Sequence, residues 1–318
     1  SRSGSRGSCR RLPPAARSRP MMLLFQLLLV APCAALRVTS RRAPRRDSRG
    51  STSDAGDAGD AALAPARAGC VTVLPDAVAV GEEVWRRVDA AAERAIAARG
   101  RFFLAIPGGS VLKMLAGTAP AWASSCVVAY VNHKAVPNDD AALATHAKAW
   151  KGFLGDWTGV EVLTLEGTAD CVAEACRYGE LLELATQSGM ATIEQDDGER
   201  LPVFDMMLVG VGDDGHIGSL YPDRDEVLDD YAWVLPVEMK VPGSVTLAFP
   251  VIHSAREVVV AACGVSDKYP QGKSEAMRRA VQAPETLRSF PAAGLRDVAD
   301  YVFDVAAASQ LDAAFLAD

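Results

Sequence analysis

A histidine enclosed by glycines and aspartates is the feature of this 318-residue chain with the clearest chemical potential. His216 lies in a segment that directly follows the apolar run at 204–209 and that we call the His216 loop: Gly210-Val211-Gly212-Asp213-Asp214-Gly215-His216-Ile217-Gly218-Ser219-Leu220-Tyr221-Pro222. Imidazole titrates near neutrality, and a neighbouring carboxylate fixes its tautomer and stabilises its charged form. The pattern predicts a general base with an aspartate as its partner. The alternative is a loop histidine that only satisfies a backbone carbonyl.

The same loop also contains the spacing of a dinucleotide-binding fingerprint. Gly210, Gly212 and Gly215 spell G-x-G-x-x-G. Asp213 and Asp214, however, would place negative charge where a pyrophosphate should sit. The motif also lies two thirds of the way along the chain instead of in the first strand–helix unit. A dinucleotide-dependent oxidoreductase therefore ranks last among the functions considered.

A second loop pairs two glycines with a serine. Ile106-Pro107-Gly108-Gly109-Ser110 leaves a predicted strand and enters a predicted helix through Leu112 and Leu115, and we call 107–110 the twin-glycine turn. Glycines let backbone N–H groups approach an anion, and a helix N-terminus adds partial positive charge. Ser110 is expected to cap the helix and to donate its hydroxyl. The turn predicts a phosphate cradle, with a plain tight turn as the equally weighted alternative.

A third loop, Tyr130-Val131-Asn132-His133-Lys134-Ala135-Val136-Pro137, again follows a predicted strand. Lys134 is a candidate to meet an anion there, and His133 is a rival general base. The alternative is that both are solvated polar residues of a connecting loop.

The elements that must position these loops form a repeating pattern of short apolar runs and longer amphipathic stretches. Continuous apolar strands separated by helices are typical of a parallel sheet covered on both faces. We therefore predict an α/β, doubly wound, mostly parallel sheet in a single domain over 70–318, with ligands at the carboxyl ends of the strands. The predicted strands are 70–74, 102–106, 126–131, 160–165, 204–211, 245–249 and 258–263, and the predicted helices include 84–98, 141–153 and 169–187.

The charge distribution of the chain limits the classes of molecule that it is expected to bind. The chain has 33 Lys plus Arg against 40 Asp plus Glu, and twelve of the arginines lie within residues 1–53, beside a single acid, Asp47. The remainder is strongly acidic and would repel a phosphate backbone, so nucleic acid is disfavoured. An anionic small substrate requires a few cations that converge locally.

The first seventy residues have the composition of targeting sequences followed by a linker. Because residue 1 is Ser, we expect 1–20 to precede the native start at Met21 or Met22, and 21–35 to be a signal peptide. That apolar run is too short to span a bilayer, so we expect no membrane segment in the mature form. Residues 36–69 are expected to be an arginine-rich transit peptide and a flexible linker. This order predicts a plastid bounded by extra membranes, with secretion as the alternative.

Cysteine and histidine usage argues against disulfides and metal. Beyond the leader there are five cysteines, with no C-x-x-C pair, which is no disulfide framework and fits a reducing stroma. The four histidines lack zinc-ligand spacing. Neither a metal nor a cofactor is expected, and the oligomeric state is left open.

Together and in this order, the three loops resemble the 6-phosphogluconolactonase family, over nearly all of residues 70–318. GVGDDGHIGSLYP is similar to that family's G-x-G-x-D-G-H-x-A-S-L-F-P signature. The related glucosamine-6-phosphate deaminases share D-G-H but continue toward F-N-E-P, so the S-L-Y-P of this chain favours the lactonase side. The twin-glycine turn resembles the family's S-G-G-S phosphate loop, with Pro107 in place of Ser.

The resemblance implies hydrolysis of a sugar-phosphate lactone, 6-phosphoglucono-1,5-lactone, to 6-phosphogluconate. It implies that His216 is the base that activates water and that Asp214 is its partner. It also implies a lysine that binds the phosphate. This is either Lys273 or Lys268, because the two lie five residues apart and the choice depends on where an insertion is placed in the alignment. The implied substrate-binding residues are Gly108, Gly109, Ser110, Lys134, Gly215, Ser219 and Lys273.

Two departures from the family pattern affect residues that are expected to bind the phosphate. The family's D-E-R is here Asn132-His133-Lys134, and the arginine before V-T-L is Ser244. Lysine keeps the charge of an arginine but not its bidentate fork. Either Lys113, Arg224 or Lys240 compensates, or the chain prefers another ligand or has lost activity. A catalytically silent sugar-phosphate-binding homologue and an amino-sugar-phosphate isomerase or deaminase are therefore the alternatives.

Overall fold

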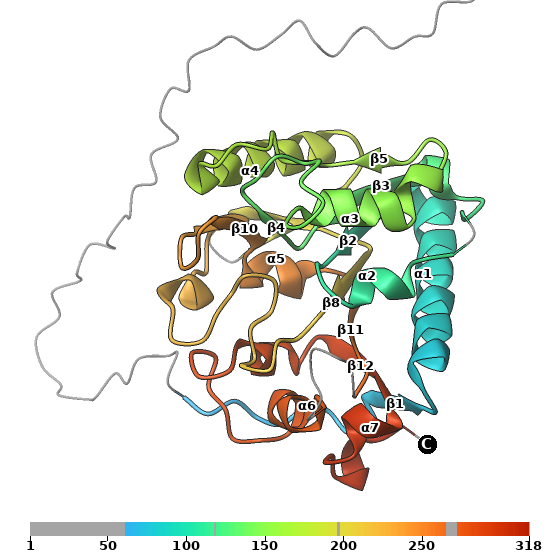
Figure 1. Ribbon diagram of the computed structural model, residues 1–318, viewed down its shortest axis with the longest axis vertical. Helices are drawn as coiled ribbons and strands as arrows, with labels where there is room; N and C mark the ends of the chain where they lie inside the picture. Colours follow the sequence, from blue (N-terminus) through green and yellow to red (C-terminus); the bar gives the residue numbers. More distant parts are fainter. Residues whose placement is uncertain (1–60, 118, 196–197, 265–271, 318) are drawn as a thin grey trace, which may run out of the picture. The chain divides into compact units, whose positions relative to one another are not determined.

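A computed structural model describes residues 61–117, 119–195, 198–264 and 272–317 (Figure 1). The predicted leader segments 1–20 and 21–35, the transit segment up to residue 60, and Lys268 lie outside the described residues. Within the described ranges, no helix is both long and apolar enough to cross a membrane.

The centre of the fold is a seven-stranded parallel sheet, which confirms the predicted fold class. Its strand order is β1-β12-β11-β8-β2-β3-β5. The strands are β1 (Val71–Leu74), β2 (Phe102–Ile106), β3 (Cys126–Tyr130), β5 (Glu161–Val162), β8 (Met206–Val209), β11 (Val258–Ala262) and β12 (Ala299–Asp304). Strand β12 was not among the predicted strands.

Side chains on the two faces of the sheet pack into two separate hydrophobic cores. In β2, Phe102, Leu104 and Ile106 pack with α1, whereas Phe103 and Ala105 face the opposite core. This alternation follows from the two-residue period of a strand, and it explains why a strand between two helical layers is apolar throughout. The helices are α1 (Ala77–Arg99), α2 (Val111–Met114), α3 (Thr145–Gly152), α4 (Cys171–Gln187), α5 (Phe249–Ser254), α6 (Ser274–Val281) and α7 (Val305–Ala308).

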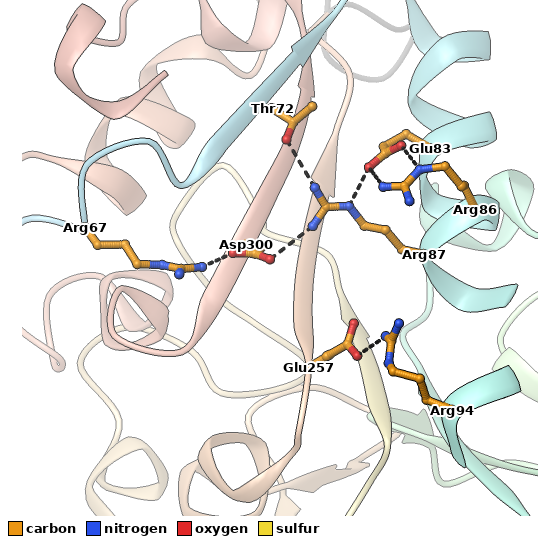
Figure 2. Close-up of polar contacts among 8 residues, drawn as sticks. All are labelled: Arg67, Thr72, Glu83, Arg86, Arg87, Arg94, Glu257 and Asp300. Atoms are coloured by element: carbon orange, nitrogen blue, oxygen red, sulfur yellow. Dashed lines mark hydrogen bonds and ion pairs between the residues drawn. The ribbon is translucent and has the colours of Figure 1, made fainter. Parts of the chain in front are cut away.

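Helix α1 begins earlier than predicted and is tied to the edge of the sheet. Its first turn is capped by Asp76, whose carboxylate accepts hydrogen bonds from the N–H groups of Val78 and Ala79. In Figure 2, Arg87 of this helix reaches Thr72 on β1 and Asp300 on β12, each at 3.1 Å. The same figure shows Arg94 paired with Glu257.

The predicted strand at 245–249 lies elsewhere than expected. Strand β10 (Ser244–Leu247) is not in the parallel sheet; it is the middle of an antiparallel sheet with β4 (Asn132–Lys134) and β9 (Val234–Val237). All four of its residues are buried, partly because α4 packs against it, so its apolar run is indistinguishable by periodicity from a central parallel strand. A third sheet pairs β6 (Ala191–Glu194) with β7 (Arg200–Val203).

The folded body starts before Cys70, so the predicted linker is too long at its C-terminal end. The N–H of Leu63 donates to the carbonyl of Glu285, and that of Ala66 to the carbonyl of Val281, both at 2.8 Å. The buried guanidinium of Arg296 donates to the carbonyls of Leu63 and Ala64 at 3.1 Å. Residues 63–66 make these contacts through their backbone N–H and carbonyl groups, so the amino-acid composition of the segment could not predict them. We call 62–69 the N-terminal arm.

Candidate active site

Most of the predicted site residues line one cleft of about 1300 Å³; Asp214 and Gly215 are not among its lining residues. Residues at the carboxyl ends of four parallel strands line it: Pro107, Gly210 and Cys263 directly follow β2, β8 and β11, and Asn132 lies two residues beyond the end of β3. The carboxyl ends of the sheet thus converge as the fold class predicts. Of the residues singled out in the sequence, the cleft is lined by Gly108, Gly109, Ser110, Lys134, His216, Ser219 and Lys273.

His216 is held by Asp214 within the loop. Its Nδ1 lies 2.5 Å from Oδ1 of Asp214, and the same oxygen accepts a hydrogen bond from the backbone N–H of His216 at 3.2 Å. The imidazole is 32% exposed and the carboxylate 54%. Because the carboxylate engages Nδ1, Nε2 is the ring nitrogen that remains to accept a proton from a molecule in the cleft.

Glycines allow this arrangement. A Cβ at Gly212 would overlap the ring of His216 and lie 2.7 Å from Oδ1 of Asp214. Gly215 has φ +88°, and a Cβ there would overlap the ring of Phe290. Its N–H donates to the carbonyl of Gly212 at 3.0 Å. The glycines of the motif therefore fold a tight turn beneath an imidazole, which is a different role from the approach to a pyrophosphate.

Electrostatics keep Asp214 ionised beside the ring. Partial burial acts to raise the pKa of this carboxyl, but the hydrogen bonds and the charge of His216 outweigh burial, and the net pKa is below the usual value. The carboxylate is thus negative at neutral pH and can stabilise an imidazolium. The ring of Tyr221 packs against that of His216 with centroids 4.8 Å apart, and Nζ of Lys240 lies 4.3 Å from the centroid of Tyr221.

The twin-glycine turn differs from the prediction at Ser110. Gly109 has φ +86°, which an L side chain rarely adopts. Ser110 precedes α2, but its side chain makes no capping hydrogen bond, so the predicted cap is wrong. Helix α2 is a single turn of four residues, too short to need a full set of caps or to carry much of a helix dipole. The exposed Ser110 hydroxyl instead lines the cleft.

His133 is not a rival base. It is 2% exposed, its Nδ1 lies 2.7 Å from the carbonyl oxygen of Lys134, and its Nε2 accepts a hydrogen bond from the N–H of His146 at 3.0 Å. Burial holds its pKa below the usual value. Both nitrogens are engaged, and the ring satisfies a backbone N–H in the first turn of α3. His133 is therefore neither a general base facing the cleft nor a solvated loop residue.

Lys134 and Lys273 both line the cleft. Nζ of Lys134 donates to the carbonyl of Pro242 at 3.2 Å, and burial together with the nearby Lys240 lowers its pKa. Nζ of Lys273, directly before α6, donates to the carbonyl of Val211 in the His216 loop at 2.6 Å. Both amines therefore lie where an anion in the cleft can reach them.

The cationic residues considered as replacements for the expected arginines differ in whether they line the cleft. Lys113 lines the cleft, whereas Arg224 forms a two-bond pair with Glu226 and lines a different hollow. Ser244 is buried and stands opposite Lys134 in the β4–β10 pair. The two positions at which the resemblance leads us to expect arginines are thus cross-strand neighbours.

Among the cleft residues that were not predicted as site residues, Asn132 and Thr145 lie beside Gly108. Asn132 follows strand β3 at the carboxyl edge of the sheet, a placement that could have marked it. Thr145 is 6% exposed and begins α3, next to Gly108. The expected helix began at 141, which put Thr145 inside a helix and hid it. Among the described residues no group of three or more His, Cys, Asp or Glu could hold a metal ion.

Known proteins are similar to this chain in sequence. A profile of the family described as "Glucosamine-6-phosphate isomerases/6-phosphogluconolactonase" matches residues 75–303. The chain is 30% identical over 207 residues to "Probable 6-phosphogluconolactonase 4, chloroplastic" of Oryza sativa subsp. indica, a match that covers 60% of this chain and 59% of that protein. It is 30% identical over 208 residues to "6-phosphogluconolactonase" of Rattus norvegicus, with 61% of this chain and 74% of that protein covered.

A solved structure shares the fold. The crystal structure of 6-phosphogluconolactonase from Leishmania guyanensis superimposes with a TM-score of 0.63 and 22% sequence identity. The superposition covers 79% of this chain and all of that one.

Proposed function

Because the chain belongs to the glucosamine-6-phosphate isomerase/6-phosphogluconolactonase family, we propose that it hydrolyses 6-phosphoglucono-1,5-lactone to 6-phosphogluconate. The observation that carries the proposal is the contact of His216 with Asp214 at a cleft that the twin-glycine turn and two lysines also line. This arrangement provides a base for a water molecule and a separate set of donors for a phosphate.

The reaction needs only groups of this chain and water. Nε2 of His216 takes a proton from water while the water oxygen bonds to the lactone carbonyl carbon. The tetrahedral oxyanion that forms is stabilised by backbone N–H groups or a lysine amine near the cleft. The bond from that carbon to the ring oxygen then breaks, and the imidazolium returns its proton to the ring oxygen. The products are a carboxylic acid, which ionises, and an alcohol.

The phosphate is expected to bind away from the imidazole. Gly108 and Gly109 offer backbone N–H groups, Ser110 offers a hydroxyl, and Lys134 and Lys273 offer charge. Ser219 lies on the cleft wall but its side chain accepts a hydrogen bond from Asn132, and Gly215 gives its N–H to Gly212. We therefore assign these last two residues to the shape of the loop.

A lactonase assay with His216→Ala tests the proposal. The wild-type chain should accelerate lactone opening beyond the spontaneous rate, and the variant should lose roughly 10² to 10⁴ in rate. His253→Gln is the matched control, because His253 is an exposed histidine that contacts the carbonyl of Gly294 and does not line the cleft. Equal rates for wild type and His216→Ala would refute the mechanism.

The buried Ser244 in place of an arginine favours one alternative, a silent sugar-phosphate-binding protein. Tight binding of 6-phosphogluconate without turnover of the lactone would identify that function. Release of ammonia from glucosamine 6-phosphate would instead identify the other alternative, an amino-sugar-phosphate isomerase or deaminase.

We also propose delivery to a plastid through a signal peptide at 21–35 and a transit peptide after it, with secretion as the alternative. The relatives named chloroplastic support this, as does the arginine-rich composition of 37–49. Since the N-terminal arm packs on the body, cleavage is expected before Ala62. Residues 21–61 fused to a fluorescent protein should reach the plastid, and export from the cell would contradict the proposal.

A further inference from the structure

The ring of Tyr221 lies against the imidazole of His216 because the His216 loop turns back on itself between them. The N–H of Leu220 donates to the carbonyl of Ile217 at 2.8 Å, and the N–H of Ile217 donates to the carbonyl of Leu220 at 3.2 Å. Only two residues separate that pair, and the first of them, Gly218, has φ +56°, which glycine adopts easily. The turn brings Tyr221 back beside His216, with ring centroids 4.8 Å apart.

Tyr221 is itself held in place. Its side chain is buried although it lines the cleft, and Nζ of Lys240 lies 4.3 Å from its ring centroid. An ammonium group over an aromatic face is attracted by the ring electrons. The Tyr221 ring is therefore a fixed surface, whereas the imidazole of His216 is partly exposed and depends on its contacts to keep one orientation.

Asp214 by itself does not fix the plane of the imidazole. Its carboxylate meets the ring at Nδ1, and a contact at one atom leaves the ring free to turn about that atom. Gly212 makes room for the same edge of the ring, since a Cβ there would overlap Nδ1 and Cε1. Tyr221 supplies the contact across the ring, at an interplanar angle of 36° and a centroid distance typical of aromatic pairs. The three contacts together hold Nε2 in one direction.

The same ring favours the charged form of the base. When Nε2 takes a proton from water, the imidazole becomes a cation, and an aromatic ring within about 6 Å attracts a cation. Asp214 supplies the opposite charge at Nδ1, and Tyr221 adds its ring electrons. The charge of Lys240 on the Tyr221 ring opposes this effect, but Lys240 is exposed, so water weakens its influence.

We propose that Tyr221 is a positioning residue whose aromatic ring fixes the plane of the His216 imidazole and stabilises that imidazole once it is protonated. The effect on catalysis rests on the proposed function. The contact between the two rings does not, since it is made within the chain. The lactonase signature S-L-F-P has phenylalanine at this position, so a ring without a hydroxyl is expected to be sufficient.

The role of the ring is tested with Tyr221→Leu and Tyr221→Phe. Tyr221→Leu should lower kcat about ten- to a hundredfold and leave KM unchanged, because the cation loses its aromatic partner and the reacting nitrogen is no longer held in place. Tyr221→Phe should keep the kcat of the wild type. Tyr231→Leu is the matched control, since Tyr231 is an exposed tyrosine outside the cleft, and it should change neither value. A wild-type kcat in Tyr221→Leu, or an equal loss in Tyr221→Phe, would overturn the proposal.

The effect of Tyr221 should act through His216. In a chain that already carries His216→Ala, Tyr221→Leu should cause little further loss of rate, because no imidazole remains to be positioned. A loss of the same size in both backgrounds would mean that Tyr221 acts on the substrate directly, against the proposal. Tyr221→Met fills the same space with a flexible side chain that has no aromatic ring, and it serves in place of Tyr221→Leu should that variant fail to fold.

Proton NMR of the full chain without substrate separates this inference from the proposed function. Protons above an aromatic ring resonate upfield, so the ring C–H signals of His216, identified by their loss in His216→Ala, should lie upfield in the wild type and in Tyr221→Phe. In Tyr221→Leu they should move toward the position of free imidazole. This pattern without lactonase activity would refute the function and support the placement of the imidazole by Tyr221. Identical His216 signals in Tyr221→Leu and the wild type would overturn that placement.

Discussion

The carboxylate of Asp214 contacts Nδ1 of His216 from only two residues away in the same loop. We expect Asp214→Asn to lower kcat strongly, by up to about 10⁴-fold. An amide can still touch the ring but cannot stabilise its positive charge or enforce one tautomer. Steady-state kinetics should show the loss in kcat with little change in KM. A loss confined to KM would mean that Asp214 binds substrate instead.

Gly212→Ala should inactivate the protein by displacing the imidazole. A Cβ at this position would overlap the ring of His216, so we expect a loss of the same order as that of His216→Ala. Gly179→Ala is the matched control: this glycine lies within α4 with no atom within 4 Å of an added Cβ. The control should keep full activity and be up to about 1 kcal/mol more stable, because alanine favours helix. Full activity of Gly212→Ala would show that the ring position is not essential.

The N-terminal arm should contribute to stability. Removing it takes away two of the carbonyls that accept from Arg296 and the backbone bonds of Leu63 and Ala66. A chain that starts at Cys70 should therefore be less stable than one that starts at Ala62, by about 2 kcal/mol, which corresponds to a Tm about 5 °C lower. Calorimetry measures the difference. Arg67→Ala, which breaks only the exposed pair with Asp300, should cost about 1 kcal/mol or less. Equal Tm values for the two chains would mean that the arm contributes nothing.

Stability should fall as the pH drops below about 6.5. Burial lowers the folded-state pKa values of both His133 and His146, so the unfolded chain binds protons in a range where the folded chain does not. The stabilisation is complete above the ordinary histidine pKa and is lost as the pH falls from there toward the folded-state values. Each histidine can contribute a slope of up to about 1.4 kcal/mol per pH unit.

The check is urea unfolding between pH 8 and pH 5, in the wild type and in His133→Gln. The variant should be less stable at pH 8, because it loses the contacts with Lys134 and His146, but its stability should depend less steeply on pH. The same slope in both proteins would show that His133 does not titrate in this way.

The sequence alone was enough to predict six of the seven strands of the parallel sheet and the loop that carries His216. Hydrophobic runs and glycine spacing are local properties of the chain, and the carboxyl ends of parallel strands meet at one edge, so Gly108 and His216 were expected to lie near each other. Strand β12 was not predicted because Asp300 and Asp304 flank a short apolar run of three residues. Both aspartate side chains bind groups outside β12.

The tertiary structure decided the roles of the polar residues around that imidazole. His133 and Lys134 are adjacent in the chain, but one is buried with both nitrogens engaged and the other lines the cleft. The antiparallel pairing of β4 with β10 sets Lys134 opposite Ser244, and Asn132 acquires its contact with Ser219 from a loop distant in sequence. The reason is physical: a side chain's charge and hydrogen bonds depend on which distant backbone and side-chain groups surround it, and only the folded chain brings those groups together.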